Sequence, residues 1–142
     1  MSLSGVCGKR DGRLCAMNTR MDRILIGNSF PLTLIRGHRV VCEEIALDAL
    51  RAALAAGAVA SFWGHENTRP VAEAILGVGL KPACDRPALG LDSEGYPVYG
   101  GVRHRVCYVL SPDYAEVHRP AVGEVVPPDA IRAWHALRLV WD

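Results

Sequence analysis

One stretch of this sequence joins a strand pattern directly to a helix pattern, and it limits the fold more than any other feature. Residues 58–63 (AVASFW) are almost wholly apolar, which predicts a short buried strand. The polar segment GHENT (residues 64–68) follows at once, and an apolar stripe at helical spacing comes next. Asn67 or Thr68 can cap this helix, and Pro70 suits its first turn. The chain therefore predicts a β-α connection, the kind of loop at which open α/β sheets bind ligands.

The rest of the chain also alternates between strand and helix patterns. Further strands are predicted at residues 23–27, 39–42, 87–91, 96–99, 105–110 and 137–141, and further helices at 45–56 and 130–136. No internal repeat interrupts this order. We therefore expect a single compact α/β domain over residues 21–142, built on a mixed, mostly antiparallel β-sheet of about five strands flanked by helices.

Residues 1–20 show neither helical nor strand periodicity. They carry Lys9, Arg10, Arg13 and Arg20 against the single acidic residue Asp11. We interpret this segment as a disordered leader or a cloning remnant, and the rival interpretation is a basic arm that closes over a ligand.

Composition narrows the class of protein. Half of the 142 residues are apolar, enough to bury a core without metals or disulfides. The five cysteines are scattered and lack metal-ligand spacing, which predicts reduced thiols and no bound metal. No apolar run approaches the roughly 20 residues of a membrane span, and no secretion signal is recognisable, so we expect a cytoplasmic protein with no membrane partner. A net charge of +1 argues against binding to long nucleic acid, so an anionic ligand would be held by a few arginines and backbone amides.

The GHENT segment has the features of an anion site. A helix N-terminus offers unpaired amides and the positive end of the helix dipole to a phosphate. Gly64 allows close approach of the backbone, and Asn67 and Thr68 supply short polar side chains. Arg69 can reach back toward the same ligand. The segment therefore predicts a site for a phosphate group.

His65 would lie beside a phosphate bound at this junction. An imidazole there can protonate a departing oxygen, a form of general acid catalysis worth roughly 10²–10⁴ in rate. Glu66, the next residue, can orient the ring. The alternative interpretation makes His65 a turn residue hydrogen-bonded to the backbone, and residue spacing alone does not choose between the two.

Other polar and aromatic residues are weaker candidates. Asn28 and Ser29 follow the first strand, where they either contact a sugar or phosphate or simply form a turn. Trp63 either stacks on an adenine or belongs to the core. Arg86 and Arg119 are surface arginines unless folding brings them to the site. The other histidines, none with a partner at metal-ligand spacing, are His38, His104, His118 and His135.

Three blocks of the sequence resemble a known protein family. They are ILIGNSF at residues 24–30, FWGHENT at 62–68 with a helix that ends in ILG at 75–77, and the closing strand at 137–141. Viral anti-CRISPR ring nucleases, together with bacterial relatives linked to type III CRISPR systems, have a strand ending in L-x-N-A-F-S and a junction G-H-[DE]-S-T. The resemblance spans residues 23–142 and is carried by these short blocks.

The resemblance implies a compact α/β homodimer that holds cyclic tetra-adenylate, the second messenger of type III CRISPR antiviral immunity, at the dimer interface. It implies a ring nuclease that needs no metal or cofactor. A ribose 2′-OH attacks the adjacent phosphorus, and His65, as general acid, protonates the 5′-oxygen that leaves. The implied products are linear oligoadenylates with 2′,3′-cyclic phosphate ends.

The resemblance also implies that Asn28, Arg86 and Arg119 hold phosphates and sugars. With the junction residues, the predicted ligand contacts are Asn28, Ser29, Gly64, Glu66, Asn67, Thr68, Arg86 and Arg119. The chain departs from the family pattern where Pro31 and Asn67 each replace a serine, and where Val122 replaces a functional glutamate with Glu124 two positions on. These departures leave a second hypothesis, a binding protein that sequesters cyclic oligonucleotides without cutting them. A third is a regulatory domain for another anionic ligand.

Overall fold

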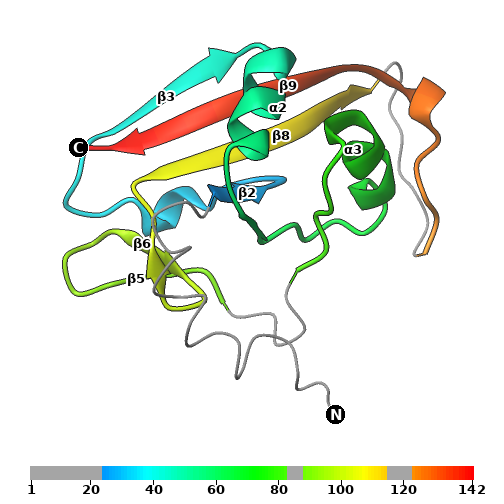
Figure 1. Ribbon diagram of the computed structural model, residues 1–142. Coiled ribbons are helices and arrows are strands. Elements are labelled where there is room, and N and C mark those ends of the chain that lie inside the picture. The colour runs from blue at the N-terminus through cyan, green and yellow to red at the C-terminus, as the bar shows by residue number, and fades with distance from the viewer. Residues whose placement is uncertain (1–23, 83–87, 115–122) are drawn as a thin grey trace.

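The computed structural model describes residues 24–82, 88–114 and 123–142, and its centre is a five-stranded sheet (Figure 1). The strand order is β3 (Val40–Ile45), β9 (Ile131–Trp141), β8 (Val106–Tyr114), β2 (Ile24–Gly27) and β4 (Val59–Ser61). β2 runs parallel to both β8 and β4, whereas β9 runs antiparallel to both β8 and β3. The antiparallel pairs β3–β9 and β8–β9 are longer than the parallel pairs. This confirms the predicted α/β fold with a mixed, mostly antiparallel sheet.

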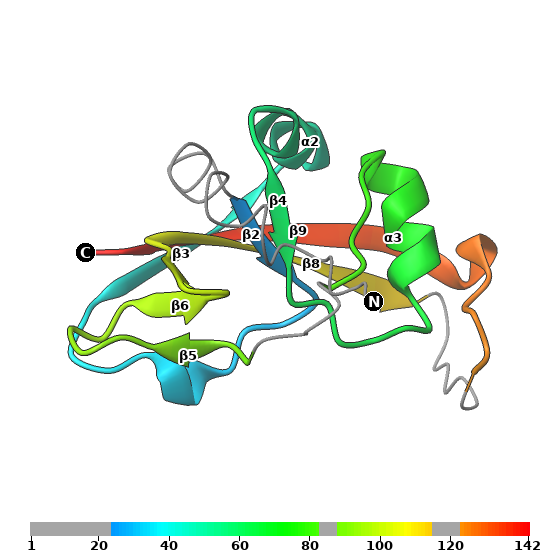
Figure 2. The ribbon, with the colours of Figure 1, turned by 60° about the horizontal axis from the view of Figure 1, so that its bottom comes forward.

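The two faces of this sheet are covered by different layers, as Figure 2 shows. Helices α2 (Leu47–Ala55) and α3 (Arg69–Leu76) lie on one face. A small sheet of β5 (Gly90–Leu91), β6 (Pro97–Tyr99) and β7 (Val102–Arg103) packs on the other. Buried side chains on the helix side are Ile26, Leu50, Leu54, Trp63, Ala72, Leu76, Leu80, Leu110 and Ala136, and those on the other side are Leu25, Ala60, Tyr99, Cys107, Val109, Leu139 and Trp141.

Several predicted elements are confirmed with adjusted ends. The helix expected at residues 45–56 begins only at Leu47, because Ile45 still pairs with Ala136 as the last residue of β3. α3 ends as expected at Gly77, which adopts a left-handed conformation with φ of 73°. None of the helices in the described ranges is long and apolar enough to cross a membrane.

The helix predicted at residues 130–136 is wrong. A short 3-10 turn at Pro128–Ala130 leads directly into β9, which pairs with β8 along nearly its whole length. Both faces of β9 are covered, with Ala136 toward the helices and Leu139 toward the small sheet. Because both faces are covered, the alternation of polar and apolar residues that identifies a strand in the sequence is weak here.

Close packing at the end of β2 depends on Gly27. A Cβ atom at this position would stand 2.3 Å from the ring of Phe62, which follows β4. The main chains are tied at the same level, because the Phe62 N–H donates to the Ile26 carbonyl at 3.0 Å. The missing side chain of Gly27 therefore makes room for an aromatic ring beside the ends of the two parallel strands.

Replacing Gly27 by alanine should destabilise the fold. A clash with the Phe62 ring is a case of overpacking, and we expect Gly27→Ala to lower the free energy of unfolding by about 1–3 kcal/mol in urea denaturation. Gly79→Ala is the matched control, because nothing lies within 4 Å of its Cβ position. Equal midpoints for the two variants would contradict this account of Gly27.

Candidate functional site

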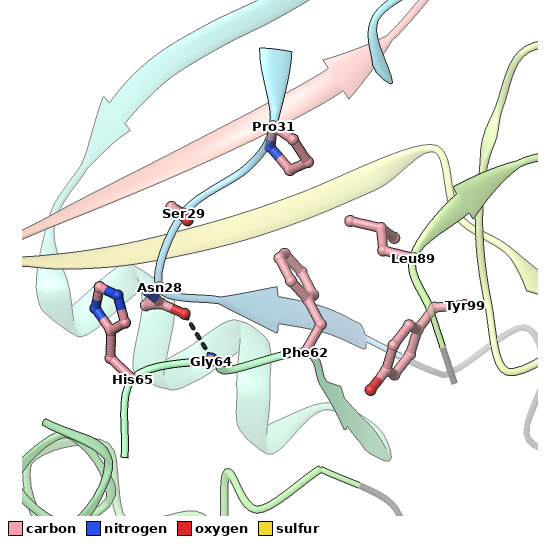
Figure 3. Close-up of a pocket in the computed structure, with 8 residues that line it drawn as sticks. All are labelled: Asn28, Ser29, Pro31, Phe62, Gly64, His65, Leu89 and Tyr99. Atoms are coloured by element: carbon pink, nitrogen blue, oxygen red, sulfur yellow. Dashed lines mark hydrogen bonds between the residues drawn. The ribbon is translucent and has the colours of Figure 1, made fainter. Parts of the chain in front are cut away.

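The candidate site lies where the parallel strands β2 and β4 end side by side. The chain continues from β2 into Asn28 and Ser29, and from β4 through Phe62 into Gly64 and His65. Asn28 joins the two segments, because its Oδ1 accepts a hydrogen bond from the Gly64 N–H at 2.8 Å (Figure 3). Asn28 is therefore more than the turn former that its position in the sequence would allow.

Hydrogen bonds to the carbonyl oxygen of His65 hold the main chain of this residue in place. This oxygen accepts hydrogen bonds from the Trp63 indole Nε1 at 2.9 Å, from the Thr68 N–H and hydroxyl at 3.2 Å each, and from the Arg69 N–H at 3.2 Å. Trp63 is completely buried, which places it in the core rather than against a ligand. The turn is thus anchored in the protein interior while His65 itself is exposed.

The imidazole of His65 borders a pocket of about 430 Å³. Its lining residues are Asn28, Ser29, Pro31, Phe62, Gly64, His65, Leu89 and Tyr99. Figure 3 shows them in two groups: His65 and Asn28 lie together at one end, and Leu89 and Tyr99 lie at the other, with Phe62 between. The pocket is therefore polar at the His65 end and apolar at the opposite end.

A second hollow of about 280 Å³ also borders His65. It is formed where the GHENT segment meets Gly123 and Glu124. Two contacts hold them together: the Asn67 side-chain amide donates to the Glu124 carbonyl, and the Val126 N–H donates to the Asn67 carbonyl at 2.9 Å. The fold therefore brings Glu124, 59 positions beyond His65 in the sequence, to the same site.

Three predicted junction residues have structural partners. Arg69 lines neither hollow, and it pairs with Glu66 at 2.8 Å and with Glu73 at 3.0 Å. The hydrogen bond that Arg69 donates to the Glu66 carboxylate is the main reason that the pKa of Arg69 is raised. Thr68 occupies the N-cap position of α3 without a side-chain capping bond, and its hydroxyl is buried against His65 and Trp63. Thr68 and Arg69 therefore shape the turn.

The other sequence candidates do not border the two hollows, or they lie outside the described residues. Arg86, Arg119 and Val122 lie outside the described residues, as does His118. His104 is buried, and both ring nitrogens of His38 lie within hydrogen-bond distance of main-chain oxygens, at 2.7 Å from Glu94 and 2.9 Å from Asp142. Within the described ranges, no group of three or more His, Cys, Asp and Glu residues is arranged to hold a metal ion.

Sequence reasoning missed the apolar end of the pocket. The sequence pattern around Phe62 predicts only the end of a strand, and the pattern around Leu89 and Tyr99 predicts only parts of a hairpin. The one local signal is an aromatic residue two positions before the glycine of the junction. Leu89 and Tyr99 join it only because the small sheet packs beside β2 and β4.

No family model matches this sequence, and no curated protein sequence matches it either.

The hydrogen bond between Asn28 and Gly64 should contribute measurably to stability. We expect Asn28→Ala to lower the free energy of unfolding by about 0.5–1.5 kcal/mol, because the Gly64 N–H loses its acceptor. Asn28→Asp keeps an acceptor at the same place and should lie closer to wild type in urea denaturation. If the alanine and aspartate variants unfold at the same urea concentration, this hydrogen bond does not contribute to stability as proposed.

Proposed function

We propose that this protein is a ring nuclease that cleaves cyclic tetra-adenylate into linear oligoadenylates, without a metal ion or cofactor. The observation that carries the proposal is an exposed His65 on a turn that four hydrogen bonds hold in place, at the ends of two parallel strands. The resemblance of the sequence blocks around Asn28 and His65 to ring nucleases supports the same activity.

The proposed reaction is internal to the ring. A ribose 2′-OH forms a bond to the adjacent phosphorus, and the bond from phosphorus to the 5′-oxygen breaks. Protonated His65 gives its proton to that leaving oxygen. The products carry a 2′,3′-cyclic phosphate at one end and a 5′-OH at the other. This chemistry depends on positioning and on charge stabilisation, so it suits a site whose backbone is fixed in advance.

A group that accepts the 2′-OH proton completes the reaction. Glu124 borders the second hollow together with His65, and we assign this role to its carboxylate. Glu124 in this role would compensate for Val122, the position at which ring nucleases usually have a glutamate.

The size of the site supports a homodimer. A pocket of about 430 Å³ is at the small end for ligand sites, and it suits one nucleotide rather than a ring of four. A second copy of the chain, related by twofold symmetry, would supply the matching pocket on the other side of a symmetric ring. Cyclic tetra-adenylate would then lie between two protomers.

The direct test is incubation of the purified protein with cyclic tetra-adenylate in the presence of a chelator. We expect linear products with 2′,3′-cyclic phosphate ends, resolved by chromatography and mass spectrometry. A ring that stays intact after long incubation at high protein concentration would refute the proposal.

His65→Ala should lower the cleavage rate by about 10²–10⁴-fold through loss of the general acid. Its urea midpoint should remain close to that of wild type, because the side chain is exposed and the turn is held through the main chain. Ring binding by this variant, measured by calorimetry, provides the control.

The alternative function is sequestration of the ring without cleavage. Tight binding of unchanged ligand by wild type, together with equal binding by His65→Ala, would favour it over the nuclease.

A further inference from the structure

We propose that the apolar end of the 430 Å³ pocket is a nucleobase subsite in which Phe62 is the stacking surface. Phe62 would then determine which bases the site accepts, with a preference for purines because they offer the larger ring. This inference deepens the proposed nuclease function and rests on it for the identity of the natural ligand. Its physical basis is the pocket itself.

The ring of Phe62 is half-buried and fixed by its neighbours. It meets Phe30 edge-on, with centroids 6.4 Å apart and an interplanar angle of 85°, and it lies 6.2 Å from the ring of Tyr99. The bare Cα of Gly27 lets it lie close to β2. A ring held in this way loses little conformational entropy when a base stacks on it.

The other residues at the apolar end of the pocket suit the flat face of a base better than they suit a charged group. Pro31 and Leu89 add apolar surface. Tyr99 is buried, and its hydroxyl proton is donated to the Ser61 carbonyl at 2.8 Å. Within the described part of the chain, no Lys or Arg lines this pocket. Base stacking, rather than ion pairing, is the attraction that this end can offer.

The polar end of the same pocket suits the sugar and phosphate of a nucleotide. Asn28, Ser29 and His65 border it, and they can contact a ribose and a phosphate. Gly64 lies between the two ends, and a Cβ there would approach only Asn28 Oδ1, at 3.7 Å. The backbone at Gly64 therefore leaves the route from Phe62 to His65 open. A base on Phe62 would leave its phosphate near the imidazole.

The experiment uses adenosine 3′-monophosphate as the probe, with cytidine 3′-monophosphate and ribose 5-phosphate for comparison. Binding to the full chain is measured by calorimetry for wild type, Phe62→Leu and Phe62→Tyr. Tyr96→Leu is the matched control, because Tyr96 is an aromatic residue on the same side of the sheet but does not line the pocket. Urea denaturation of each variant checks that it is folded.

We expect Phe62→Leu to weaken binding of the adenosine nucleotide about tenfold, which lies within the range for loss of one stacked base. Phe62→Tyr, which keeps the ring, should bind within about threefold of wild type, and Tyr96→Leu should do the same. The cytidine nucleotide should bind more weakly than the adenosine nucleotide, and ribose 5-phosphate more weakly still. Because Phe62→Leu removes core contacts, NMR of the wild type provides a second readout: its Phe62 ring protons should shift with the adenosine nucleotide and not with ribose 5-phosphate.

The inference is overturned if wild type binds no mononucleotide, if ribose 5-phosphate binds as tightly as the adenosine nucleotide, or if Phe62→Leu binds like wild type. These outcomes are separable from failure of the nuclease proposal. Ring cleavage with unchanged KM in Phe62→Leu would leave the nuclease and remove the base subsite. Phe62-dependent binding of the adenosine nucleotide without any ring cleavage would leave the subsite and remove the nuclease.

Discussion

The carbonyl oxygen of His65 is the point on which the site depends. Four hydrogen bonds converge on it, and one comes from the indole of Trp63, which belongs to the buried core on the helix side of the sheet. The same oxygen accepts from the first residue of α3, Arg69. This single oxygen therefore connects the end of β4, the turn at residues 64–68 and the start of α3. The bonds that hold the turn are thus made by the main chain of His65 and not by its imidazole.

The second constraint is the parallel pairing of β2 with β4. The carboxyl ends of neighbouring parallel strands lie at the same edge of the sheet. The polar residues that follow β2 and β4 are therefore neighbours, whatever the conformation of the loops. Asn28 then locks the two ends together through Gly64, and Gly27 lets the Phe62 ring approach. The long antiparallel pair β8 and β9 provides the rigid frame beside them. A site on such strand ends keeps its geometry better than one on free loops.

The charge of the site is low for a pocket expected to receive a phosphodiester. Arg69, the nearest cation by sequence in the described part of the chain, is neutralised by Glu66 and Glu73. In the proposed reaction, charge stabilisation within the described part of the pocket would therefore come from main-chain and side-chain dipoles and from His65. If the site receives the proposed ligand, it would select that ligand by shape and hydrogen bonding rather than by ion pairing.

The sequence by itself determined the α/β class, the position of the strand-to-helix junction and the end of α3 at Gly77, because these follow from local periodicity and from glycine at a helix end. Only the tertiary structure decided that residues 131–136 extend a strand, since pairing with β8 outweighs their local helix preference. It also decided which junction side chains are available. Thr68 and Arg69 have buried or ionic partners. Phe62, Leu89 and Tyr99 line the same pocket as His65, and Glu124 borders the second hollow beside it. Contacts of this kind join segments far apart in the chain, and no local pattern encodes them.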